Sequence, residues 1–196
     1  RGKIDAFIED KVKEAAELRA RYGNSVYLLE PEVKLGDGGL RALHTALWIA
    51  RARFRMAGIR ELLVGGVLSS REARSRARAY NFLLRGRAEI HLAAKRRRDA
   101  LGFDLQESIA LVLGYGRPGR TDPRGRKHAT ERFMRAYYFH AHQNRRVSQL
   151  VVERATVGSV RRMPSDEPAV LRVAVSNPDQ IDRALAVVSE IARPMQ

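Results

Sequence analysis

The residues best suited to chemistry in this sequence lie in one short stretch, residues 30–41, which combines acidic residues, a lysine, several glycines and an arginine. The N–H groups of a glycine-rich turn that enters a helix can surround an anion. Lysine and arginine side chains can neutralise phosphate charge. One interpretation is a phosphate-holding site in which Lys34 and Arg41 neutralise the phosphate charge. The alternative is a tight interdomain turn in which Arg41 pairs with a local carboxylate.

Several familiar catalytic patterns are missing from the sequence. Nucleotidyl transfer needs carboxylates that hold two Mg²⁺ ions, usually an Asp-x-Asp pair, and the sequence contains no such pair. It also has no His-Asp dipeptide, no His-Glu-x-x-His and no Gly-Lys-Ser/Thr string. We therefore predict no catalytic and no metal-ligating residues, and expect the chain alone to be catalytically silent.

The remaining histidines and aromatic residues favour structural roles. His91 falls on an apolar helix stripe, which indicates a buried, hydrogen-bonded histidine rather than a ligand. His140 and His142 are two residues apart and face different sides of a helix, which argues against a shared metal. Trp48 and the tyrosine pair at 137–138 are typical of core or interface anchors.

The composition indicates a folded protein with a polyanionic partner. Lys and Arg total 37 against 22 acidic residues, a formal net charge of +15. A nucleic acid, a nucleoside triphosphate or an acidic protein surface would suit this charge, although a fragment that has lost an acidic neighbour would show the same excess. The absence of cysteine excludes disulfides, thiolate catalysis and Cys-based zinc sites. No apolar run approaches the roughly 18 residues of a membrane span, so we expect no membrane association and a cytoplasmic location. Without an initiator Met, the chain is expected to begin inside a longer protein.

The spacing of apolar residues predicts a mainly α fold, a helical bundle with one or two short strands near the N-terminus and near residue 172. The strands are expected at 25–29 and 169–175, and a basic, mobile loop at 117–127. The helix over 71–101 is apolar on a wide arc, as in the middle of a bundle, and Ser69 and Ser70 can cap it. Helices are predicted at 4–22, 40–56, 59–64, 71–101, 103–114, 130–155 and 181–192.

Read together, several strings resemble the PII uridylyltransferase family. They are Tyr27-Leu-Leu-Glu-Pro-Glu-Val-Lys34, Gly38-Gly-Leu-Arg41, His44-Thr45, Phe82-Leu-Leu-Arg85, Arg87, His91-Leu92, Arg97 with Asp99, Phe103-Asp-Leu-Gln106, Leu113-Gly-Tyr115 and Glu131-Arg-Phe-Met-Arg-Ala-Tyr-Tyr138. Their order and spacing are specific, and the likeness extends over about residues 7–192.

The resemblance implies a piece of a large multidomain enzyme. In that family a front domain uses UTP and Mg²⁺ to transfer uridylyl to the PII nitrogen-signalling protein, and a following phosphohydrolase domain removes the group. The domains implied here are 1–39, the end of the nucleotidyltransferase domain with its Gly-rich junction; 40–157, a helical bundle; and 158–196, a linker toward the next domain. The piece would brace the active site and help position nucleotide or PII, with Lys34, Gly38, Gly39 and Arg41 binding nucleotide. Neither Mg²⁺ nor UTP is expected to bind this fragment alone.

One departure from the family pattern leaves alternatives open. The family usually has an aspartate after the Gly-Gly-Leu-Arg string, and this sequence has Ala42. Either this chain is a degenerate regulatory relative, or the missing carboxylate only supported a local hydrogen bond. A different class, a basic helical nucleic-acid-binding module, would also explain the charge, but no helix-turn-helix or aromatic sheet signature supports it.

Overall fold

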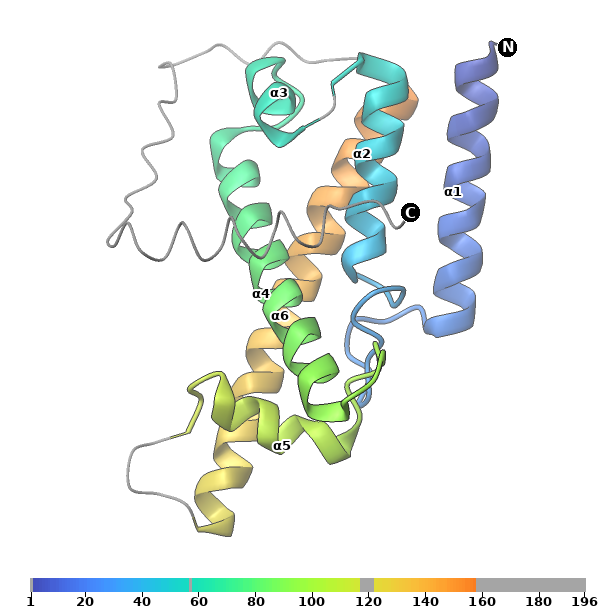
Figure 1. Cartoon of the computed structure of the whole chain (residues 1–196). Helices are drawn as coiled ribbons and strands as arrows, with labels where there is room; N and C mark the ends of the chain where they lie inside the picture. Colours follow the sequence, from blue (N-terminus) through green and yellow to red (C-terminus); the bar gives the residue numbers. More distant parts are fainter. Residues whose placement is uncertain (1, 57, 117–121, 158–196) are drawn as a thin grey trace, which may run out of the picture. The chain divides into compact units, whose positions relative to one another are not determined.

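The computed structural model of the chain describes residues 2–56, 58–116 and 122–157. This part contains helices α1 to α6 (Figure 1). Their bounds are α1 Lys3–Tyr22, α2 Leu40–Phe54, α3 Ile59–Val64, α4 Ser70–Ala94, α5 Phe103–Val112 and α6 Pro123–Val157. None of these helices, within the residues described, combines the length and apolar character needed to cross a membrane. The predicted mainly α fold is confirmed.

The longest helix, α6, is the centre of the bundle. It packs against α2, α4 and α5, while α1 packs along α2 (Figure 1). Its buried residues recur every three or four positions, which places them on one face of the helix. That face includes Phe133, Tyr137, Ala141, Asn144 and Ser148. The main core cluster joins α6 to α4, α5 and the loop residues Val26 and Val33, so the loop before α2 is anchored in the bundle.

The start of α4 confirms the predicted serine cap. The Ser69 hydroxyl accepts from the Glu72 N–H at 3.3 Å, and the Glu72 carboxylate accepts from the Ser69 N–H at 2.7 Å. This reciprocal pair satisfies two N–H groups that a helix start otherwise leaves free. Helices α1, α2, α3 and α5 also match their predicted ranges within about two residues at each end.

The predicted end of α4 at residue 101 is wrong. The helix ends at Ala94, and Lys95 takes the left-handed conformation with φ 50°. Residues 99–101 then pair with residues 31–33. The Val33 N–H donates to the Asp99 carbonyl at 2.8 Å and the Leu101 N–H to the Pro31 carbonyl at 2.9 Å. These non-local bonds replace the helical bonds that residues 99–101 would otherwise make.

The strand predicted at 25–29 is also wrong. The segment forms turns, and the Ser25 hydroxyl accepts from the Tyr27 N–H at 3.1 Å. Such a local bond competes with strand pairing. Tyr27 and Leu29 are 63% and 69% exposed, so the apolar run does not line a sheet. Within the described residues the closest approach to a sheet is one antiparallel bridge between Glu32 and Ala100. The strand near residue 172 and the helix at 181–192 lie outside the described residues.

The last helix begins earlier than predicted. It starts at Pro123 rather than near residue 130, so residues 123–127 of the predicted loop are helical. Proline has no N–H to lose in the first turn of a helix, which makes it a favoured start. Residues 117–121 of that loop lie outside the described residues.

Candidate functional site

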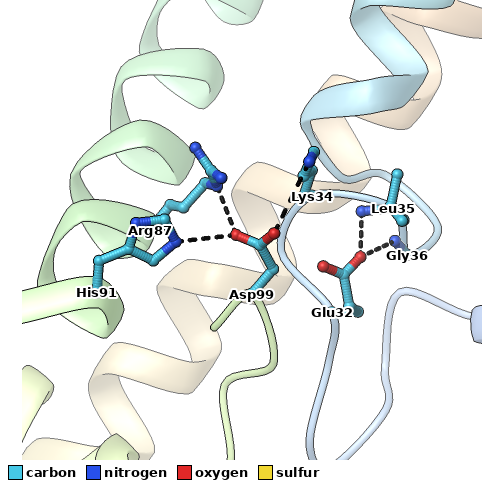
Figure 2. A network of polar contacts seen from close by, with 7 residues as sticks. All are labelled: Glu32, Lys34, Leu35, Gly36, Arg87, His91 and Asp99. Carbon is cyan, nitrogen blue, oxygen red and sulfur yellow. Dashed lines mark hydrogen bonds and ion pairs between the residues drawn. The ribbon is translucent and has the colours of Figure 1, made fainter. Parts of the chain in front are cut away.

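The loop before α2 is held in shape by two of its acidic residues, Glu32 and Glu30. The Glu32 carboxylate accepts from the N–H groups of Leu35 and Gly36 (Figure 2). Burial raises the pKa of Glu32, although these N–H bonds oppose the shift and the charge of Asp99 adds to it. Glu30 accepts from the Phe103 N–H at the start of α5, at 2.7 Å. Both carboxylates therefore fix the backbone around Lys34.

Asp99 is the carboxylate on which three basic side chains meet (Figure 2). Its Oδ1 atom lies 2.6 Å from Arg87 Nε and 3.1 Å from His91 Nε2, and its Oδ2 atom lies 3.9 Å from Lys34 Nζ. The Asp99 side chain is 17% exposed. Burial alone would raise the pKa of Asp99, but the hydrogen bonds from Arg87 and His91, with the charges of Arg87 and Lys34, hold it below its ordinary value. Asp99 is therefore ionised and joins α4 to the loop before α2.

Lys34, Arg41, Arg76 and Arg87 lie close enough to His44 to act on its charge, and we call these four basic residues the cationic cluster. Burial lowers the pKa of His44, and the charges of the four basic residues lower it further. The imidazole is therefore neutral near pH 7, and its Nε2 atom lies 3.3 Å from the Tyr80 hydroxyl. Positive charge thus accumulates at this place from α2, α4 and the loop between α1 and α2.

Two arginines of the cationic cluster rest on aromatic rings instead of carboxylates. The Arg76 guanidinium carbon lies 4.7 Å from the centre of the Tyr80 ring, and that of Arg41 lies 5.3 Å from the Trp48 ring. The Arg76 Nε atom is buried without a hydrogen-bond partner among the described residues. A partly buried cation without a counter-charge is unfavourable, so the site is suited to an anion supplied from outside. The alternative in which Arg41 pairs with a local carboxylate is not seen within the described part of the chain.

The two predicted glycines hold the loop close to α6. Gly38 has φ +71°, and a Cβ added there would lie 2.3 Å from the Ala141 carbonyl oxygen. Asn144, which is fully buried, donates from Nδ2 to the carbonyls of Gly38 and Gly39 at 2.9 Å and 2.8 Å. The glycines therefore allow a close approach that a side chain would prevent.

The N–H groups at the start of α2 are already used. Those of Gly39, Leu40 and Arg41 donate to the carbonyls of Gly36, Val33 and Lys34, at 2.9, 3.0 and 2.8 Å. An anion at this loop would thus meet mainly the side chains of Lys34 and Arg41. Nucleotide binding by Lys34, Gly38, Gly39 and Arg41 stays a prediction.

The structure brings Lys34 and Arg41 to one place and adds residues that sequence reasoning missed. Arg76 and Arg87 lie on α4, which follows helices α2 and α3 along the chain. No local sequence pattern predicts that they approach Lys34 and Arg41. Arg87 and Asp99 stood out only as parts of the family-like strings. Asn144 lies on the buried face of α6, where a polar residue among apolar ones is the signal that the sequence offers.

The histidine and tryptophan predictions have mixed outcomes. His91 is hydrogen-bonded, as predicted, but half-buried rather than buried. His140 stacks on Phe82 with ring centres 4.4 Å apart, and burial lowers its pKa. Trp48 is partly exposed, and Lys11 of α1 lies 5.5 Å from its ring. Among the described residues, no group of three or more His, Asp or Glu side chains is placed to hold a metal ion.

The described residues thus form a helical bundle that carries a cluster of basic side chains, and comparison with known proteins is more specific. The family model for GlnD PII-uridylyltransferase matches residues 6–152. The chain belongs to this family. No solved structure matches it.

Its relatives carry one description, "bifunctional uridylyltransferase/uridylyl-removing enzyme". The protein from Nitrobacter hamburgensis is 43% identical over 71% of this chain, which is 14% of the relative. The Burkholderia mallei protein is 40% identical over 76% of this chain and 17% of the relative. The Rhodospirillum rubrum protein is 44% identical over 69% of this chain and 14% of the relative. The chain therefore spans less than a fifth of the length of these relatives.

Proposed function

We propose that this chain is the helical part of a nucleotidyltransferase that uses UTP to uridylylate the PII signal protein. In this role the cationic cluster neutralises the triphosphate at the edge of a neighbouring catalytic domain. The family membership and the names of the relatives support the reaction. The observation that carries the role of the cluster is that four basic side chains act on His44, while Asp99 pairs with only two of them, Lys34 and Arg87.

The chemistry assigned to the cluster is electrostatic. Charge develops on the phosphate oxygens as the nucleotidyl group is transferred, and fixed cations stabilise that charge. Lys34 and Arg87 are held in place by Asp99, so their orientation costs little when the nucleotide binds. Arg41 and Arg76 lack a carboxylate in the described part of the chain and are available to phosphate oxygens.

Mg²⁺ accompanies the nucleotide in this proposal, but the residues described here do not fit a metal site. Asp99 is engaged by Arg87, His91 and Lys34, and Glu32 by backbone N–H groups. Both carboxylates therefore hold the fold together, and the metal ligands belong to another part of the enzyme. PII and the neighbouring transferase and phosphohydrolase domains are the proposed partners, in the cytoplasm, with neither nucleic acid nor a membrane involved.

The test is steady-state kinetics of the intact enzyme with Arg76→Gln and Arg41→Gln. Loss of one charged contact to phosphate should raise the KM for UTP or lower kcat/KM by about tenfold or more. Arg74→Gln is the matched control, because Arg74 is exposed two residues away on the same helix. Thermal unfolding of each variant checks that the fold is retained.

Two outcomes would redirect the proposal. If kcat/KM for UTP is unchanged in both variants, the cluster does not bind the triphosphate. If instead only the KM for PII rises, the cluster binds an acidic surface of the protein substrate. Lys34→Ala is less decisive, since Lys34 also pairs with Asp99.

A further inference from the structure

A cavity of about 220 Å³ lies between α1, α2 and α6, and we call it the α1–α2–α6 cavity. Its wall is largely aliphatic, with Val12 from α1, Ile49 from α2 and Val152 from α6. A dry cavity of roughly 150 Å³ can hold a molecule as large as benzene. The α1–α2–α6 cavity therefore has room for a ligand with a short aliphatic body.

Positive charge lines the same cavity. Arg19, Arg41 and Arg145 contribute to its lining. Arg145 Nη1 lies 2.8 Å from Asp37 Oδ2, so this pair is close to neutral. Within the described residues no carboxylate pairs with Arg19 or Arg41, and Glu153, which also lines the cavity, is exposed. The lining thus keeps a surplus of guanidinium groups.

A buried hydroxyl group at the cavity lacks a hydrogen-bond partner among the described residues. Ser148 of α6 is 4% exposed and lines the cavity, and its Oγ atom has no hydrogen-bond partner among the described residues. Leaving such a group unpaired costs roughly 1–3 kcal/mol, so native proteins rarely do so without a reason. Asp37, at 7% exposed, lies in the same lining. An oxygen-bearing ligand would satisfy the Ser148 hydroxyl.

We infer that the α1–α2–α6 cavity binds a small organic monocarboxylate with a short aliphatic body. The carboxylate meets the free guanidiniums of Arg19 and Arg41 and accepts from the Ser148 hydroxyl. The aliphatic body packs on the wall formed by the three helices. An uncharged hydrocarbon would leave the guanidiniums unpaired, and an inorganic anion would leave the aliphatic wall uncovered.

Calorimetric titration of the intact protein with three probes tests this chemistry. Pentanoate carries both the charge and the aliphatic body, acetate carries the charge, and pentan-1-ol carries the body. Pentanoate should bind at least about tenfold more tightly than either control, because only pentanoate gains both contributions. Equal binding of all three probes, or no binding of pentanoate, overturns the inference.

Variants then place the binding in the cavity. Arg19→Gln should weaken pentanoate binding by about tenfold, whereas Arg21→Gln, an exposed arginine on the same helix, should leave it unchanged. Ala42→Leu should fill the cavity and abolish binding, since Ala42 lines it; Ala88→Leu, exposed on α4, is its control. Circular dichroism checks the fold, and Arg19→Gln decides the question if Ala42→Leu does not fold. Unchanged affinity in Arg19→Gln overturns the site. Arg41 belongs to both the cavity and the cationic cluster, so Arg19, which lines the cavity but is not in the cluster, distinguishes this site from the proposed function, and the titration uses neither UTP nor PII.

Discussion

His44 links the charge of the cationic cluster to the stability of the bundle. Its ring touches Tyr80 of α4 and lies 6.4 Å from the Trp48 ring, so it sits where α2 meets α4. A protonated His44 would carry a positive charge there and would repel Arg41, Arg76 and Arg87. The charges of these arginines already lower the pKa of His44. Neutral His44 is therefore a condition for packing the basic side chains together.

The first prediction is that His44→Gln reduces the loss of stability on acidification. The folded-state pKa of His44 lies below its unfolded value of about 6.5, so the unfolded chain binds the proton more readily. The stability due to neutral His44 is present above that value and is lost as the pH falls through the folded pKa. Urea unfolding at about pH 7 and about pH 5 measures this loss, which the variant should show to a smaller extent.

His142→Gln is the control, because His142 is exposed on α6. The carboxylates with lowered pKa values, such as Asp99, titrate below this window. His140 contributes in the same direction, since burial lowers its pKa. An identical decline in wild type and His44→Gln would show that His44 does not titrate with folding.

Two of the four basic residues of the cationic cluster, Lys34 and Arg41, could be predicted from the sequence. Lys34 and Arg41 stand in a Gly-rich segment that also fits a tight turn, and the family resemblance adds weight to the anion-binding interpretation. Arg76 and Arg87 are two of many arginines on α4, and Arg74, two residues before Arg76, is exposed. Only the packing of α4 on α2 decides which of them face His44, and tertiary packing has no local sequence signature.

At the scale of elements, periodicity predicted the helices but not all of their ends. Gly23 marks the end of α1 as expected, whereas α4 ends at Lys95 in a left-handed conformation that lysine rarely adopts. No glycine marks that end, so the sequence favoured a longer helix. The pairing of residues 31–33 with 99–101 is non-local, and the apolar run at 25–29 has no partner strand among the described residues. Both errors arise because pairing partners cannot be read from local patterns.

The second prediction concerns the contact between the loop before α2 and helix α6. Gly38→Ala should destabilise the chain by about 1–3 kcal/mol, because the residue has positive φ and the new Cβ would clash with the Ala141 carbonyl. Gly86→Ala is the matched control. It lies inside α4 with open space around the added Cβ, so it should stabilise the helix by roughly 0.5–1 kcal/mol. Urea midpoints of the two variants should move in opposite directions, and a neutral Gly38→Ala would contradict the close approach.

At the scale of the whole molecule, the positive charge exceeds what internal ion pairs can balance. The sequence has 37 basic and 22 acidic residues, and several acidic side chains are already engaged, including Asp5 by Arg53, Asp104 by Arg98 and Glu72 by Arg154. Arg74, Arg78 and Arg85 are exposed on α4 and add to this surplus. A chain of formal charge +15 repels itself in the compact state.

The last prediction follows from this self-repulsion. Raising NaCl from about 0.05 M to about 0.5 M shortens the range of charge interactions and should raise the urea midpoint of the chain. Replacing Arg74, Arg78 and Arg85 together by Gln should reduce that salt effect, because these exposed residues add to the net positive charge but lie outside the cationic cluster. Inorganic tripolyphosphate at matched ionic strength should stabilise the wild type further, since a bound ligand stabilises the folded state, and Arg76→Gln should remove only this additional gain. A gain from tripolyphosphate that persists in Arg76→Gln would mean that the charge acts diffusely and that the cationic cluster has no special affinity for phosphate.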